Sequence, residues 1–137
     1  MIYLDTAALV KLVRVEAESA ALVAWLNEHP AEPMVASALV EVEVPRALRR
    51  SQPGVLGGVA AVLARLHRVD LNAAVRATAG AYPDPLPRSL DAIHLATAEL
   101  LVASGGPLIA FVTYDKRLAE AAGQAGLPLA APGQEAA

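Results

Sequence analysis

The sequence of 137 residues contains no cysteine, and only 4% of its residues are aromatic. The lack of cysteine excludes disulfide frameworks, thiolate zinc sites and cysteine nucleophiles. No run of about 18 or more apolar residues occurs, because charges and prolines interrupt every stretch, so we expect no membrane span. The opening Met-Ile-Tyr-Leu-Asp lacks the basic and long apolar segments of a signal peptide, which favours a cytoplasmic protein.

The remaining composition is typical of one folded domain. Hydrophobic residues make up 55% of the sequence and charged residues 18%, a balance that argues against intrinsic disorder. Because aromatics are scarce, the core must be packed mainly by Ala, Val and Leu, which suits helices lying on a buried parallel sheet. We expect a single domain over residues 1–132 and a disordered tail over residues 133–137.

The charge is distributed unevenly. The net charge of −3 argues against a protein that coats nucleic acid by electrostatics alone. Residues 44–83, however, hold six arginines and no lysine against a single aspartate, which gives this segment a charge of +5. Arginines hold phosphates and carboxylates bidentately, so Arg46, Arg49 and Arg50 are candidates for contact with RNA or with an acidic partner segment. A merely solvated basic face is the alternative.

Short apolar runs alternate with helical periodicity along the whole chain. The runs predict strands at residues 1–4, 34–36, 68–71, 108–112 and 127–130. Helices are predicted over residues 6–13, 16–28, 37–50, 55–67, 72–81 and 90–104, and from 115 onward, with Ser37, Asn72 and Ser89 as N-caps. This alternation predicts an α/β fold in which a mostly parallel sheet of four to five strands carries helices on both faces.

Four acidic residues lie at strand ends or in the adjoining helices: Asp5, Glu43, Asp91 and Asp115. In parallel sheets, ligands bind outside the carboxyl ends of the strands, where these side chains could gather. Each also has a structural explanation. Asp5 and Asp115 can cap helices, Asp91 suits a first helical turn, and Glu43 can be a solvated helix residue.

Carboxylates gathered at one edge repel each other and therefore require protons or cations. Hard divalent ions such as Mg²⁺ or Mn²⁺ accept oxygen ligands. The absence of cysteine and the wide scatter of the three histidines do not support a zinc site. A bound Mg²⁺ lowers the pKa of a water ligand, orients it and neutralises charge on a transferring phosphoryl group, and two such ions can act together.

Four segments, in this order, resemble the PIN-domain ribonucleases and, among them, the VapC toxins of toxin–antitoxin pairs. They are residues 3–12, 37–50, 90–98 and 112–118, and together they span almost the whole chain. The resemblance implies a three-layer α/β/α sandwich and an Mg²⁺- or Mn²⁺-dependent endoribonuclease. It also implies an RNA substrate (tRNA or another structured RNA), a cognate antitoxin, a homodimer and a toxin–antitoxin hetero-oligomer.

The resemblance places the acidic site on Asp5, Glu43, Asp91 and Asp115. It implies that Asp5 and Asp91 are the principal metal ligands, and that Glu43 and Asp115 complete the shell, one of them deprotonating the attacking water. Two hydroxyls support this site: Thr113 is expected to orient Asp115, and Thr6 to add a polar contact beside Asp5.

Two positions near this site have competing interpretations. Glu41 and Glu43 cannot face the same way, because a helix turns about 100° per residue. We expect Glu43 to face the site and Glu41 to lie on the surface or behind it. His94 lies one turn after Asp91, and we expect a packed, structural imidazole.

Two other functions remain compatible with these residues. One is a catalytically inactive PIN-like binding module. The other is a phosphatase that uses Asp5 as a nucleophile at the end of the first strand. Haloacid dehalogenase-like enzymes of that kind carry a second aspartate two residues on, where this sequence has Ala7.

Overall fold

The computed structural model describes residues 1–134. In this part of the chain the sheet has five strands, all parallel, in the order β3-β2-β1-β4-β5. The strands are β1 (Ile2–Leu4), β2 (Met34–Ser37), β3 (His67–Val69), β4 (Ala110–Val112) and β5 (Leu129–Ala130). The predicted α/β fold with a parallel sheet is therefore confirmed.

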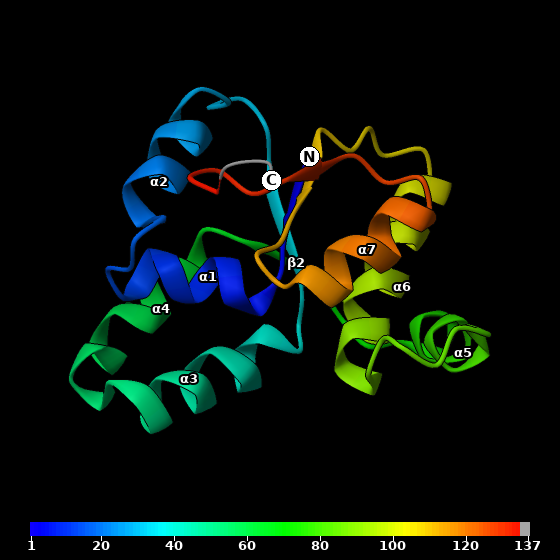
Figure 1. The fold of residues 1–137 in the computed structure, drawn as a ribbon, viewed down its shortest axis with the longest axis horizontal. Helices are drawn as coiled ribbons and strands as arrows, with labels where there is room; N and C mark the ends of the chain where they lie inside the picture. The colour runs from blue at the N-terminus through cyan, green and yellow to red at the C-terminus, as the bar shows by residue number, and fades with distance from the viewer. Residues whose placement is uncertain (135–137) are drawn as a thin grey trace.

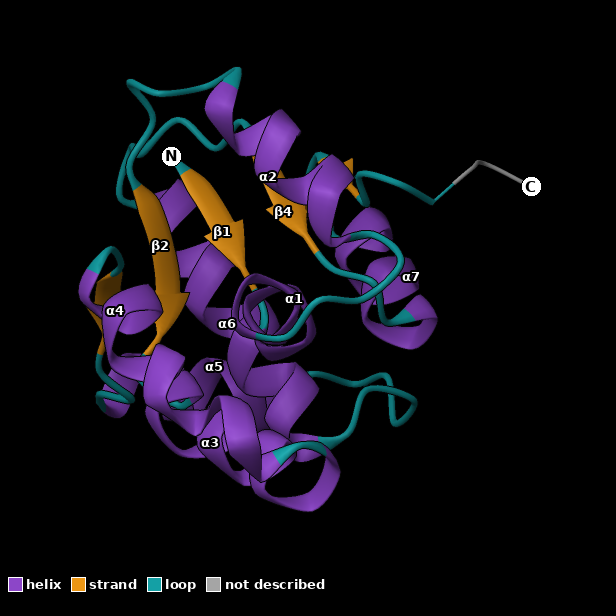
Figure 2. Cartoon of the chain, turned by 90° about the vertical axis from the view of Figure 1, so that its left-hand side faces the viewer, coloured by secondary structure: helices purple, strands orange, loops and turns teal. Residues whose placement is uncertain are grey.

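The helices connect successive strands. They are α1 (Thr6–Val13), α2 (Ser19–Asn27), α3 (Val40–Ser51), the 3₁₀ helix η1 (Pro53–Gly58), α4 (Val59–Ala64), α5 (Ala73–Ala81), α6 (Ser89–Ala103) and α7 (Lys116–Gln124). Helices α1 to α4 lie on one side of the sheet and α5 to α7 on the other (Figure 1). The turned view shows the sheet between these two sets of helices (Figure 2). The molecule is a three-layer α/β/α sandwich.

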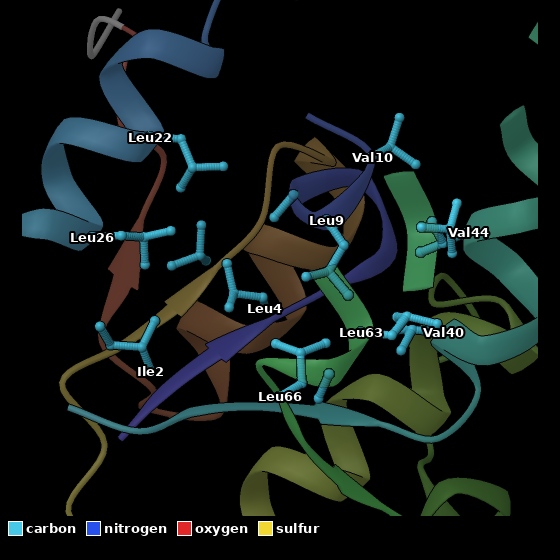
Figure 3. Close-up of a cluster of buried hydrophobic side chains, with 14 of the residues drawn as sticks. Ile2, Leu4, Leu9, Val10, Leu22, Leu26, Val40, Val44, Leu63 and Leu66 are labelled. Carbon is cyan, nitrogen blue, oxygen red and sulfur yellow. The ribbon is translucent and has the colours of Figure 1, made fainter. Parts of the chain in front are cut away.

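Each face of the sheet has its own hydrophobic core. On the first face, Leu4 of β1 packs with Leu9 of α1 and Val44 of α3, and leucines of α2 and α4 complete the cluster (Figure 3). On the second face, Tyr3 and Phe111 pack against α6 and α7. Successive residues of a strand point to opposite faces, so β1 supplies both cores and all three of its residues are fully buried.

Some predicted boundaries differ from the structure. Ser37 and Ser89 are not N-caps: Ser37 is the last residue of β2, with Leu39 at the cap of α3, and Ser89 is already inside α6, which Arg88 caps. The long helix predicted over residues 55–67 is the 3₁₀ helix η1 followed by the short α4. Gly57 and Gly58 disfavour a continuous α-helix at this point, because glycine loses the most backbone entropy on ordering.

The order of the strands places β1 and β4 side by side, although they are far apart in sequence. The chain runs from β1 outward to β2 and β3, then returns to add β4 on the other side of β1. Connections from the carboxyl ends of β1 and β4 therefore leave toward opposite faces, and such a switch point is where open α/β sheets bind ligands. Asp5 directly follows β1, and Thr113 directly follows β4.

The predicted C-terminal tail begins in a turn. The backbone N–H of Gln134 donates to the carbonyl of Ala131 at 3.0 Å, and Gly133 has a φ of 89°, a conformation that glycine adopts readily. Residues 135–137 of the expected tail lie outside the described residues. Among residues 1–134, no helix combines the length and apolar character that crossing a bilayer requires.

Candidate active site

A cavity of about 360 Å³ opens at the switch point between β1 and β4. All four predicted acidic residues line it, although they come from four different segments of the chain. The other lining residues are Thr6, Ala7, Val10, Lys11, Arg14, Glu16, Ala47, His94 and Leu118. The topology therefore brings together carboxylates that 110 positions of sequence separate.

Asp5 is the most deeply buried of these carboxylates, with 3% of its surface exposed. Its Oδ1 accepts the backbone N–H of Ala8 at 2.9 Å and so caps α1, while its Oδ2 accepts the hydroxyl of Thr113 at 2.6 Å. Burial raises the pKa of Asp5 and the nearby Asp115 carboxylate raises it further, against the opposing effects of His94 and the two hydrogen bonds. The charged form of Asp5 is therefore under-stabilised by the protein alone.

Asp115 and Asp91 both use one carboxylate oxygen to stabilise a helix start. Oδ1 of the exposed Asp115 accepts the N–H of Leu118 at 2.9 Å and caps α7. Oδ2 of Asp91 accepts the N–H of Arg88 at 3.2 Å, at the start of α6. Since the other oxygen of each carboxylate accepts no hydrogen bond within residues 1–134, it is available to a ligand in the cavity.

Both hydroxyls, of Thr113 and of Thr6, make polar contacts at the site. Thr113 accepts the backbone N–H of Asp115 at 3.1 Å, and its own proton goes to Asp5. Thr113 therefore fixes the loop that carries Asp115 and the side chain of Asp5 together. The Thr6 hydroxyl, next to Asp5 in the chain, donates to Oε1 of Glu43 at 2.6 Å.

Glu43 and Glu41 have different surroundings, although they lie only two positions apart on α3. Glu43 lines the cavity, and its Oε1 accepts hydrogen bonds from Thr6 and from Nε2 of His94, the latter at 2.9 Å. Burial raises the pKa of Glu43, but the hydrogen bonds from His94 and Thr6 outweigh burial and hold the pKa below its usual value. Glu41 is exposed and pairs with Arg68 at 3.5 Å, outside the cavity.

Some cavity residues had no distinguishing signal in the sequence. Lys11 of α1 and Arg14, the C-cap of that helix, bring positive charge to the cavity wall, where Lys11 pairs with Glu18 at 2.9 Å and Arg14 with Glu16 at 3.3 Å. Their helical spacing was compatible with any amphipathic surface helix. His94 is 3% exposed, which agrees with the expected packed imidazole, but its bond to Glu43 was not foreseen.

The arginines predicted to contact RNA or a partner are exposed on α3 and do not line the cavity themselves. Glu43 and Ala47 mark the side of α3 that faces the cavity. At 100° per residue, Arg46 and Arg50 lie on that same side, whereas Arg49 points away from it. The structure thus separates Arg49 from the other two.

The donor set fits a hard divalent cation. Every acidic side chain at the cavity offers oxygen, and Asp5 has no Lys or Arg ion-pair partner within residues 1–134. In that same part of the chain, no three Asp, Glu or His groups are arranged to hold one ion directly. Mg²⁺ usually binds through one or two carboxylates and keeps several waters, so this looser arrangement suits it better than a closed cage.

The geometry defines a class of protein: a parallel α/β/α sandwich with an acidic cavity at its topological switch point. A PIN domain model matches residues 2–124 of the chain. Ribonuclease VapC35 of Mycobacterium tuberculosis is 54% identical over 134 residues, which cover 98% of this chain and 98% of the relative. Ribonuclease VapC46 of the same species is 40% identical over 131 residues, covering 96% and 97%.

A solved structure supports the same fold. The crystal structure of Mycobacterium tuberculosis VapC20, a sarcin–ricin-loop-cleaving toxin, matches with a TM-score of 0.69 over 88% of this chain and 95% of that chain. At 17% identity this likeness concerns the fold alone. The full-length relatives and the PIN domain match establish the family. The chain belongs to the PIN-domain family and, within it, to the VapC proteins, which confirms the resemblance found in the sequence.

Proposed function

We propose that this protein is a divalent-cation-dependent endoribonuclease and the toxin of a toxin–antitoxin pair. The observation that carries the proposal is the convergence of Asp5, Glu43, Asp91 and Asp115 on one cavity at the switch point. Full-length relatives named as ribonucleases support RNA as the substrate class. Mg²⁺ or Mn²⁺ is the proposed cofactor because all these donors are oxygen atoms.

Within this site, we assign Asp5 and Asp91 as the principal ligands and Glu43 as a further one. Both oxygens of Asp5 accept a hydrogen bond, but each carboxylate oxygen has a second lone pair for a cation or its water. When bound, the cation would lower the pKa of a water ligand and neutralise charge on the phosphodiester. The raised pKa of Asp5 supports this assignment, because a cation would offset its buried charge.

Asp115 is the better candidate for the general base. It is exposed at the cavity, and only its Oδ1 is engaged in capping α7, so Oδ2 can take a proton from the attacking water. The oxygen of that water then bonds to phosphorus, the bond from phosphorus to the departing ribose oxygen breaks, and this oxygen takes up a proton from solvent. Glu43 is less suited to this role, because its pKa lies below the usual value and two donors already occupy its Oε1.

RNA and an antitoxin are the proposed partners. Arg46 and Arg50 lie on the cavity side of α3, where their guanidinium groups can hold phosphates of a bound strand. An apolar groove of about 510 Å³ between α1 and α2 shares Lys11 and Arg14 with the cavity. Its exposed Val15 supports docking of an antitoxin segment that reaches from this groove into the acidic site.

The cleavage assay tests this function directly. Purified protein, freed of metal with a chelator, is incubated with total RNA and then with added Mn²⁺ or Mg²⁺. We expect discrete cleavage products only after the cation is added, and no products in the chelated sample. Cleavage that persists in the chelator would contradict cation dependence. If the protein binds RNA but yields no products under either condition, it is instead an inactive binding module.

The pH dependence of stability provides a test that needs no substrate. Because the folded pKa of Asp5 is raised, its contribution to stability is complete below the unfolded pKa of about 3.9 and is lost as pH rises through the folded pKa. The pKa of folded Glu43 is lowered, so its contribution to stability is complete above the unfolded pKa of about 4.3. This contribution is lost as the pH falls through the folded pKa.

In thermal melts over a pH series, added Mn²⁺ is therefore expected to raise the melting temperature progressively more as Asp5 ionises. Ligand binding to the native state stabilises it by mass action, and only the ionised carboxylate offers a full ligand charge. In Asp5→Asn the increment from Mn²⁺ should be much smaller and nearly independent of pH. An equal increment in both proteins would place the cation away from Asp5.

A further inference from the structure

A chain of hydrogen bonds runs from the core of the sheet to the acidic cavity. The backbone N–H of Ser37 in β2 donates to the Tyr3 hydroxyl at 3.2 Å, and this hydroxyl lies 2.7 Å from Nδ1 of His94. Nε2 of His94 lies 2.9 Å from Oε1 of Glu43, which also accepts the Thr6 hydroxyl at 2.6 Å. The chain thus links β1, β2, α6 and α3 through two buried rings.

The positions of the protons along this chain follow from its donors. Burial raises the pKa of Tyr3 well above its usual value, so the phenol keeps its single proton. The N–H of Ser37 is a donor, so the Tyr3 oxygen accepts there and its own proton is free to go to Nδ1 of His94. The Glu43 carboxylate has only acceptors, so Nε2 of His94 carries a proton and donates to it.

Packing fixes the same rings in place. Tyr3 stacks on Phe111 of β4 with ring centroids 4.9 Å apart and an interplanar angle of 5°. It meets His94 edge to face, at 5.9 Å and 80°. Because Tyr3 is fully buried and His94 is 3% exposed, neither ring has room to take another orientation without opening the core. The donor offered to Glu43 is therefore held in a fixed direction.

We propose that His94 is a positioning residue, set by Tyr3, that holds Oε1 of Glu43 so that Oε2 faces the cation in the cavity. This inference rests on the proposed function, since it concerns the cation of that same site. Two donors occupy Oε1, from His94 and Thr6, and no hydrogen bond within residues 1–134 reaches Oε2. Outer hydrogen bonds of this kind orient metal-binding side chains, and their loss typically weakens metal affinity by about 10- to 100-fold.

The same geometry argues against His94 as a direct ligand. A metal-bound imidazole nitrogen must present its lone pair, whereas Nε2 of His94 carries a proton directed at Glu43. The two interpretations predict different behaviour for a side chain that can donate at the Nε2 position but has no ring. Glutamine is such a side chain, because its amide nitrogen lies at about the distance of Nε2 from the backbone.

The test compares Mn²⁺ affinity, measured by calorimetry on metal-free protein, in the parent and in His94→Gln, His94→Leu and Tyr3→Phe. We expect His94→Leu to weaken Mn²⁺ binding by about 10- to 100-fold. His94→Gln should restore the affinity to within a few-fold of the parent. Tyr3→Phe, which keeps the ring but loses the hydroxyl, should give an intermediate loss. Leu26→Ala, a buried change on α2 outside the cavity and outside this hydrogen-bonded chain, is the control for destabilisation and should leave the affinity unchanged.

Nitrogen-15 NMR of the imidazoles supplies the second measurement, with the His94 signals identified by their absence in His94→Gln. We expect Nε2 of His94 to carry a proton in the metal-free parent. An imidazole without a proton at Nε2, or equal Mn²⁺ affinity in the parent and His94→Leu, would overturn the positioning role while leaving the proposed function intact. Equal loss in His94→Gln and His94→Leu would also overturn it, in favour of direct ligation. A parent that binds no Mn²⁺ would refute the proposed function itself.

Discussion

Asp5→Asn is expected to reduce RNA cleavage by more than about 100-fold, because loss of a principal ligand should exceed the 10- to 100-fold effect typical of outer-shell partners. The same change is expected to stabilise the metal-free protein near neutral pH. The Asp5 carboxylate is buried without an ion-pair partner in the described chain, and burial raises its pKa, so its charge opposes folding. An enzyme that gains stability as it loses activity is typical of a strained functional site.

The neutral side chain can keep the local hydrogen bonds. Oδ1 of asparagine can still cap α1 through Ala8, and its amide can donate to the Thr113 hydroxyl oxygen. For a domain of this size we expect the melting temperature to rise by about 4 °C for each kcal/mol that the buried charge costs. Asp70→Asn is the matched control, because Asp70 is exposed and does not line the cavity.

Two measurements decide this prediction: initial cleavage rates with saturating Mn²⁺, and thermal melts in the presence of a chelator. Asp70→Asn should match the parent in both. Cleavage by Asp5→Asn at the rate of the parent would remove Asp5 from the site. A lower melting temperature in the chelator would mean instead that the carboxylate is stabilising as a helix cap and costs nothing as a buried charge.

The second large effect separates two glutamates that share a helix. Glu43→Gln should reduce cleavage by about 10- to 100-fold or more, since it removes the charge that faces the cavity and replaces one carboxylate oxygen by an amide nitrogen, which is no ligand for a cation. Glu41→Gln should leave cleavage unchanged. It removes only an exposed ion pair with Arg68, worth at most about 1 kcal/mol of stability.

Both variants replace a glutamate of α3 by glutamine and change the net charge equally. A difference between their cleavage rates therefore reports only the position of the side chain. Rates should be compared at equal Mn²⁺ concentration and over a range of it, because weaker binding of the cation is the expected cause. If Glu41→Gln lost activity and Glu43→Gln kept it, the orientation of α3 toward the cavity would be wrong. Equal loss in both would point to a general electrostatic effect of α3 on RNA binding.

Structural and functional explanations of the acidic residues turn out to be compatible. Asp5 and Asp115 cap α1 and α7, and Asp91 stabilises the start of α6, as first-turn and N-cap acids commonly do. Capping occupies one oxygen of Asp115 and one of Asp91 and turns the rest of the carboxylate toward the cavity. The helix caps thereby place the site, because the carboxyl ends of β1 and β4 are also where two of these helices begin.

The sequence predicted Asp5 and Asp115 at this edge because Asp5 ends a short apolar strand, Asp115 lies shortly after another, and both start a helix. It also predicted that only one of Glu41 and Glu43 could face the site, from the helical repeat alone. Which of the two does so depends on how α3 packs on α1 and the sheet. The expectation that it is Glu43 came from the resemblance to a family. Periodicity carries no information about such packing.

The hydrogen-bonded chain behind Glu43 could not be predicted. Tyr3 and His94 are 91 residues apart, and an aromatic in a short apolar strand is ordinarily a core residue. Ser37 was assigned to a helix cap because serine favours that position, yet it completes β2 and its backbone N–H sets the direction of the Tyr3 hydrogen bond. Local propensity carries no information about such partners, since they are brought together by strand order.

Anomalous diffraction from crystals soaked in Mn²⁺ tests the central claim most directly, because it locates the cation without reference to activity. We predict a peak inside the cavity, with Asp5 and Asp91 oxygens bound directly or through one water and with Oε2 of Glu43 turned toward the ion. The same peak should be absent from Asp5→Asn crystals. A peak elsewhere on the surface, or none in the cavity of the parent at saturating Mn²⁺, would contradict the assignment of this acidic cavity as the cation site.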